Sequence, residues 1–262
     1  MTGLREAVRV ELLKSRRSRV PWLVGAGFSA APLVTGLFMV ILKDPETARR
    51  LGLLGAKAQL AAGTADWPSL LSMLGQAVAV GGAVLFAFLT SWIYGREFAD
   101  RTIRGLLAVP VSRGATVVAK AAVVAAWGLA IGAWVVALGF GVGAIVGLPG
   151  WSGELAVTAA WRMAGALVLT IALQPVTGLL ASVGRGYIAG LAWAVLTVAA
   201  SQVLAVLGWG DAFPWAVPAL LAGAAGPDAG AIEPASVALV AGTGALGLWL
   251  AVRWWQRADQ AA

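Results

Sequence analysis

Residues 117–146 read VVAKAAVVAAWGLAIGAWVVALGFGVGAIV, a stretch in which Lys120 is the one charged side chain. A helix needs about 20 consecutive apolar residues to cross the hydrocarbon core of a bilayer, with a range of roughly 17–25. The stretch from Val117 to Val146 exceeds that length, so a helix there has room to tilt or to project from the membrane. It therefore predicts a membrane-spanning helix.

Five further apolar stretches have lengths that suit a spanning helix. They run from about Val20 to Leu42, Leu70 to Tyr94, Met163 to Val183, Tyr187 to Leu207 and Ser236 to Trp255. The first is too long for the h-region of a secretory signal, which has roughly 7–15 residues, so we expect it to be an uncleaved helix. We therefore predict an all-α integral membrane protein with six transmembrane helices, forming a single domain over residues 1–262.

The composition agrees with a membrane protein. Of the 262 residues, 60% are hydrophobic and 12% are charged, and the mean hydropathy is +0.86. A soluble domain has roughly 45–50% apolar and about 25% charged residues, so a water-soluble enzyme is excluded, and the high hydrophobicity also excludes a disordered chain. The chain has no Cys and no His, which removes disulfides, thiolate nucleophiles and the usual metal ligands.

The distribution of basic residues predicts the orientation. Lys and Arg are concentrated on the cytoplasmic side of membrane proteins. If the N-terminus is cytoplasmic, five of the nineteen basic residues fall outside and fourteen inside. The outer five are Lys43, Arg49, Arg50, Lys57 and Arg162. We therefore expect both termini in the cytoplasm of a bacterial cell, and we assign the net charge of +7 to orientation in the inner membrane, not to nucleic-acid binding.

Two segments outside the spans have distinctive patterns. Residues 1–19 place Leu4, Val8 and Leu12 four residues apart among basic side chains, which predicts an amphipathic interfacial helix; a disordered basic tail is the alternative. Residues 209–235 are apolar but interrupted by four prolines, so we expect a broken, re-entrant-like segment at the outer face.

Features of catalytic sites are missing from the sequence. The chain has no G-x-x-x-x-G-K-[ST] phosphate-binding loop, and its carboxylates are scattered, so we expect no catalytic, metal or cofactor site in this chain. Arg162 is either a pathway residue or a side chain that snorkels to the interface. Gln174 and Pro175 predict a kink that either faces a cavity or serves packing alone. Glycines at 128, 132, 139, 143 and 147 suit close helix packing, although a glycine-rich composition also explains them.

The loop after the second span, GREFADRTIRGLLAVPVSR at residues 95–113, has the strongest local pattern. It is short and charged, it can form a helix up to Pro110, and Phe98, Leu106 and Leu107 are apolar groups within it. Glu97 can pair with Arg101 one helical turn later. Such a surface suits docking to a soluble partner, and the alternative is an interfacial helix held by lipid headgroups.

This loop resembles that of the ABC-2 type permeases, the membrane subunits of bacterial ATP-driven exporters. The family pattern has an acidic residue at the end of the second span, a Thr, a Leu pair, and Pro-x-Ser-Arg before a Lys in the third span. The residues that match in order and spacing are Glu97, Thr102, Leu106, Leu107, Pro110, Ser112, Arg113 and Lys120. In the family the Thr often follows Gly, whereas Arg101 precedes it here.

The resemblance implies that the loop is a cytoplasmic coupling helix that docks on a separate ABC ATPase subunit, where ATP and Mg²⁺ are bound. Its docking residues would be Glu97, Phe98, Arg101, Thr102, Leu106, Leu107, Pro110, Ser112 and Arg113. Two permease copies, identical or related, would enclose a pathway for a hydrophobic or amphipathic compound such as a drug, an antibiotic or an antimicrobial peptide, which would make antibiotic resistance one physiological role. A lipid-modifying membrane enzyme and a stand-alone secondary transporter are the alternatives, and both are disfavoured by the scarcity of ionisable groups in the spans.

Overall fold

The computed structural model describes residues 3–44, 64–103, 105, 110–223 and 233–258, and these residues form helices and turns with no strand. Six helical segments are long and apolar enough to cross a membrane. They are α2 (Val20–Lys43), α4–η2–α5 (Trp67–Ala99), α7 (Arg113–Val146), α8–α9 (Gly153–Val183), α10 (Ile188–Val206) and α12 (Pro234–Arg257). The predicted number of spans is confirmed, and the second, third and fourth helices extend several residues beyond the predicted ends.

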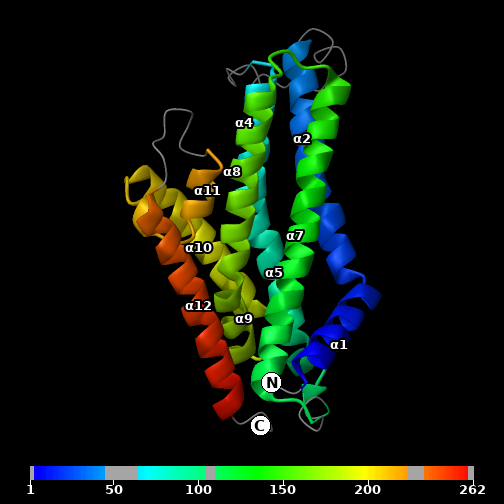
Figure 1. Ribbon diagram of the computed structural model, residues 1–262, viewed down its shortest axis with the longest axis vertical. Helices are drawn as coiled ribbons and strands as arrows, with labels where there is room; N and C mark the ends of the chain where they lie inside the picture. Colours follow the sequence, from blue (N-terminus) through cyan, green and yellow to red (C-terminus); the bar gives the residue numbers. More distant parts are fainter. Residues whose placement is uncertain (1–2, 45–63, 104, 106–109, 224–232, 259–262) are drawn as a thin grey trace.

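The spans run alongside one another and form an elongated bundle (Figure 1). The start of α1 (Leu4–Arg17) and the end of α12 lie at the same end of the bundle, as an even number of spans requires. The loop at residues 95–113 lies at this end too, which we call the loop end; the opposite end is the far end.

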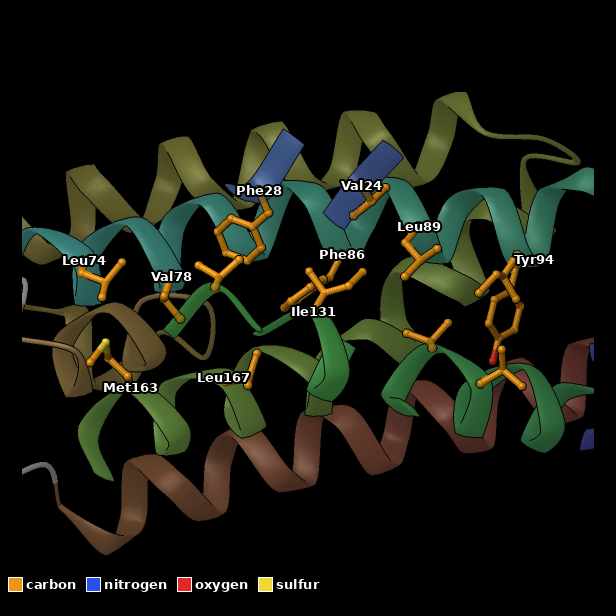
Figure 2. Packing of buried hydrophobic residues seen from close by; sticks show 14 of the residues in the cluster. Val24, Phe28, Leu74, Val78, Phe86, Leu89, Tyr94, Ile131, Met163 and Leu167 are labelled. Carbon is orange, nitrogen blue, oxygen red and sulfur yellow. The ribbon is translucent and has the colours of Figure 1, made fainter. Parts of the chain in front are cut away.

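The long helix α7 packs against α1, α2, α8 and α12. Four of its glycines, at 128, 132, 139 and 143, lie where neighbouring side chains come close: Gly132 faces Leu167 of α8, and Gly139 faces Leu74 of α4 (Trp67–Gln76). A methyl group at either glycine would overlap the leucine, so the four-residue spacing serves helix packing. Figure 2 shows the core that results, with Phe28 against Phe86 at a centroid distance of 5.7 Å.

The second and fourth spans each depart from regular α-helix. The second contains one π-helical turn, η2 (Ala77–Gly81), between α4 and α5 (Gly82–Ala99). The fourth is broken at Leu173, between α8 (Gly153–Ala172) and α9 (Gln174–Val183). Pro175 has no backbone N–H to donate to Ile171, which explains the break.

The far end of the bundle is held by contacts among three spans. Lys43 donates to the carbonyls of Val146 and Gly147 at 2.8 and 3.1 Å, which satisfies acceptors at the end of α7. The backbone N–H of Trp67 donates to Pro149 at 3.0 Å, and the Trp67 ring lies 4.5 Å from that of Trp151. These contacts fix the far ends of α2, α4 and α7 to one another.

The broken segment predicted at residues 209–235 is described up to Gly223. It contains one 3₁₀ turn, η3 (Gly210–Ala212), and the five-residue helix α11 (Val217–Leu221), which packs on α8. Val217 is fully buried against Leu169, Leu173 and Val240. Residues 224–232 lie outside the described part.

Candidate functional site

Five charged side chains meet at the loop end, and we call them the charge cluster. They come from α1 (Glu11, Lys14), the last turn of α5 (Arg96, Glu97) and the first turns of α7 (Lys120). Lys120 Nζ lies 2.8 Å from Glu97 and 3.2 Å from Glu11, and Arg96 Nη2 lies 2.6 Å from Glu11. The cluster therefore joins three helices that are far apart in the sequence.

Four of these groups are almost inaccessible to solvent, and they neutralise one another. Glu11, Arg96, Glu97 and Lys120 are all buried, two acids against two bases, and Lys120 has no exposed surface. Lys120 also donates to the carbonyl of Ile93 at 2.8 Å, and the Arg96 guanidinium lies 4.7 Å from the centre of the Trp92 ring. Removing one partner of a buried pair leaves an uncompensated charge, which is strongly destabilising.

Glu11 is the acid through which α1 joins this cluster. Burial raises the pKa of Glu11, but the nearby charges of Lys120, Arg96 and Lys14 outweigh burial and hold that pKa below its ordinary value. The side chain is therefore a carboxylate at neutral pH. Lys14, the most exposed member of the cluster, lies 2.9 Å from Glu11 at the edge.

A second contact ties α1 to α7 one turn further along. The Trp127 indole donates to the Ser15 hydroxyl at 2.9 Å, and the Ser15 hydroxyl donates to Leu12. Ala7, Glu11 and Ser15 are the buried residues of α1, spaced four apart, so they form the face that packs on the bundle. The predicted stripe of Leu4, Val8 and Leu12 is half-buried beside this face.

The last turn of α5 ends in a left-handed residue. Arg101 has a φ of 56°, its N–H donates to Phe98, and the N–H of Thr102 donates to Glu97 at 2.9 Å. These two hydrogen bonds are the pair that closes a helix when the residue after it has a left-handed backbone. That residue is usually Gly. Arg101 therefore occupies a left-handed position that usually holds Gly, and the turn is closed although this chain has Arg there.

The Pro-x-Ser-Arg part of the motif caps two helices. The Ser112 hydroxyl accepts from the N–H of Ala115 at 3.2 Å, which makes Ser112 the N-cap of α7. Arg113 donates to the carbonyls of Trp255 and Ala258 at 3.3 and 3.4 Å, where the cation suits the end of α12. Pro110 is exposed before this turn.

Phe98 fixes the loop end to α12 by aromatic contacts. Its ring lies 6.1 Å from Trp254 and 5.7 Å from Trp255, and the Trp255 indole donates to Ser182 of α9 at 3.0 Å. The glycine at 95 also permits a close approach, because a Cβ there would come within 2.8 Å of the Gly186 backbone. The end of α5 is therefore held from α1, α7, α9 and α12.

The structure separates the predicted docking residues into two groups. Glu97, Phe98 and Arg113 make contacts inside the chain, whereas Arg101, Thr102, Pro110 and Ser112 have exposed surface. Leu106 and Leu107 lie outside the described residues. The ion pairs recorded for Glu97 are with Lys14, Arg96 and Lys120 and not with Arg101, the partner considered from the sequence.

Three members of the charge cluster have roles that sequence reasoning missed. The sequence predicts cytoplasmic positions for Arg96 and Lys120 and matches Lys120 to the Lys of the family pattern, but it does not bring either of them together with Glu11. The position of Glu11 could have indicated its role, because it lies four residues from both Ala7 and Ser15. It is an acid on the packing face of a mostly basic helix. Among the described residues, no group of acidic side chains has the arrangement of a metal site.

The remaining predicted residues lie in the fourth span. Arg162 is exposed on α8, nine residues from its start, beside Trp161. Gln174 is buried at the helix break: its Oε1 accepts from Thr90 of α5 at 3.1 Å, and its Nε2 donates to Thr170 at 3.1 Å. Gln174 and Pro175 thus lie at the start of α9, directly after the break at Leu173.

Comparison with known proteins agrees with the pattern of the loop. Residues 7–201, about three quarters of the chain, match the family described as ABC-2 family transporter protein. The comparison with curated proteins finds no match. The matched region includes the charge cluster, the first four spans, and most of α1 and of the fifth span. The chain therefore belongs to the ABC-2 transporter family, and it is a membrane permease subunit of an ABC transporter.

Proposed function

We propose that this permease exports a hydrophobic or amphipathic compound across the bacterial inner membrane, driven by ATP and Mg²⁺ bound to a separate ATPase subunit. Two permease copies form the pathway, and both termini face the cytoplasm. The loop at residues 95–113 is the coupling element that contacts the ATPase. A drug, an antibiotic or an antimicrobial peptide is the class of substrate, and resistance to it is the expected phenotype.

One observation supports this role best. The loop joins two helices whose ends are fixed to the rest of the bundle, and it has exposed residues between those two ends. Asp100, Arg101, Thr102 and Pro110 are exposed, while the charge cluster and Arg113 hold the ends of α5 and α7. A partner that pushes on an anchored loop displaces the helices attached to it. A loop on flexible tethers would absorb the motion instead.

Co-purification with the ATPase encoded nearest to this chain's gene tests the proposal. Arg101→Glu reverses an exposed charge on the loop, so we expect it to lower ATPase recovery and ATP-driven export at least several-fold, with normal permease levels. Arg257→Glu is the matched control, because Arg257 is also an exposed arginine at the loop end, in the last turn of α12 and outside the loop.

The outcomes of this experiment are distinct. The proposal requires loss of recovery and export with Arg101→Glu and retention of both with Arg257→Glu. Equal recovery and export with both variants would show that the loop is not the coupling element. ATP turnover by this chain purified alone would contradict the separate ATPase.

A further inference from the structure

The break between α8 and α9 forms one wall of a pocket of about 180 Å³. The other walls are α5 and α7. The lining residues are Thr90, Tyr94, Ala121, Val124, Ala125, Ile171, Ala172, Gln174 and Pro175. Ala121, Ala125 and Pro175 are half-buried, whereas Tyr94 and Val124 are fully enclosed, so the pocket reaches from the membrane-facing surface into the interior.

The volume of the pocket limits what it can hold. An engineered protein cavity of about 150 Å³ binds benzene, so a pocket of about 180 Å³ has room for one ring of that size with a small substituent. Its lining contains no ionisable side chain except the Tyr94 phenol, and that hydroxyl already donates to Val117 at 3.0 Å. A charged ligand would lose its hydration there without gaining a counter-ion, which is strongly unfavourable.

The polar groups of the wall favour a ligand that donates a hydrogen bond. Ile171 and Pro175 both line the pocket, and the Ile171 carbonyl lacks the donor that residue 175 would give in a regular helix; the backbone N–H of Leu173, which the carbonyls of Ile171 and Leu169 share, leaves it acceptor capacity. Gln174 Oε1 and the Thr90 hydroxyl oxygen also have acceptor capacity left beyond the bonds that they make. Acceptors therefore predominate, and they lie next to an apolar surface of alanine and valine.

We propose that this pocket binds an uncharged, ring-sized group that carries one hydrogen-bond donor, such as a phenol, and that the ligand enters from the bilayer. The hydroxyl donates to the acceptors at the Ile171–Pro175 break, and the ring contacts Ala121, Val124 and Ala125. Binding at this site does not depend on the ATPase, so its test is independent of the proposed export function.

Fluorine NMR of the full chain in detergent micelles tests the site with two probes, 4-fluorophenol and fluorobenzene, which differ by the hydroxyl. We expect saturable binding of 4-fluorophenol and an affinity for fluorobenzene that is lower by about 2- to 10-fold, the factor that one net hydrogen bond supplies. Equal affinities, or a response that does not saturate with either probe, would overturn the proposal. This comparison uses the unmodified chain and needs no variant.

Two variants locate the site. Ala125→Leu adds three carbon atoms to the wall and should weaken 4-fluorophenol binding at least tenfold, whereas Ala126→Leu, on the exposed side of the same helix, should leave it unchanged. Equal binding by the two variants would place the probe elsewhere. Pro175→Ala restores a donor to Ile171 and leaves Gln174 and Thr90 as acceptors, so the preference for the phenol over fluorobenzene should fall; an unchanged preference would overturn the assignment of the Ile171 carbonyl as an acceptor.

Discussion

Lys120 shows how much one side chain holds together at the loop end. It is fully buried, it pairs with acids from two other helices, and it donates to the Ile93 carbonyl. If the amine were removed, the carbonyl of Ile93 would lose its donor, and Glu11 and Glu97 would share Arg96 and the partly exposed Lys14 as their remaining cations. The stability of the region therefore depends on this residue more than on the exposed charges around it.

We expect Lys120→Ala to lower the free energy of unfolding by about 3–5 kcal/mol, because it leaves two buried carboxylates with one buried cation, Arg96, between them. Lys14→Ala is the matched control in the same cluster; its side chain is 38% exposed, so the loss should stay within about 1 kcal/mol. Denaturant unfolding of the purified chain in detergent measures both. Similar losses in the two variants would mean that the buried pair contributes little.

Substitution of Glu97 would disturb the charge cluster as well as the loop. Because Glu97→Ala would leave Lys120 with Glu11 as its one remaining acid, loss of export in that variant would report disturbed packing as well as lost contact with an ATPase. The exposed Arg101 is the cleaner position, since its side chain takes no part in the charge cluster. This is why the experiment on coupling uses Arg101.

At the scale of elements, α1 is attached to the bundle through a carboxylate, so its attachment should depend on pH. The pKa of Glu11 lies below its ordinary value of 4.5 in the folded chain, since the cations around it outweigh the effect of burial. A lowered pKa means that the charged carboxylate stabilises the fold above pH 4.5, and that this stabilisation is lost as the pH falls further. We therefore expect α1 to loosen in acid.

Cysteine accessibility measures this loosening, because the chain has no native Cys. Ala7→Cys, on the buried face of α1, should react slowly with 4,4′-dithiodipyridine at pH 6 and faster below pH 4.5. Arg9→Cys, on the exposed face, should react at similar rates at both pH values. If Glu11→Gln did not abolish the pH dependence at position 7, another group would be responsible.

The elements were largely predictable from the sequence, and the charge cluster was not. The thickness of the bilayer core sets the length of a spanning helix, so apolar runs marked α2, α7, α10 and α12 to within a few residues. Glu11 meets Arg96 and Lys120 across 85 and 109 residues of chain. Such distant partners are set by how helices pack, which periodicity within a helix does not reveal.

For the whole molecule, the basic residues predict that the loop end faces the cytoplasm. Single cysteines at Arg16, Gly153 and Arg257 test this, since all three positions are exposed and Gly153 has open space for a side chain. A membrane-impermeant maleimide added to intact cells should label Gly153→Cys alone, and lysis should make the other two reactive. Labelling of Arg257→Cys in intact cells would contradict the orientation.

The contacts among α2, α4 and α7 at the far end affect the outline of the molecule. α7 has 34 residues, about 51 Å of helix, against a hydrocarbon core of about 30 Å. In Figure 1, α2, α4, α7 and α8 reach further toward the far end than α10, α11 and α12. The far end is therefore stepped, with a raised shoulder that Lys43 and the Trp67–Trp151 pair brace. If the loop end faces the cytoplasm, as the basic residues predict, antibodies raised against whole cells should recognise epitopes on that shoulder first.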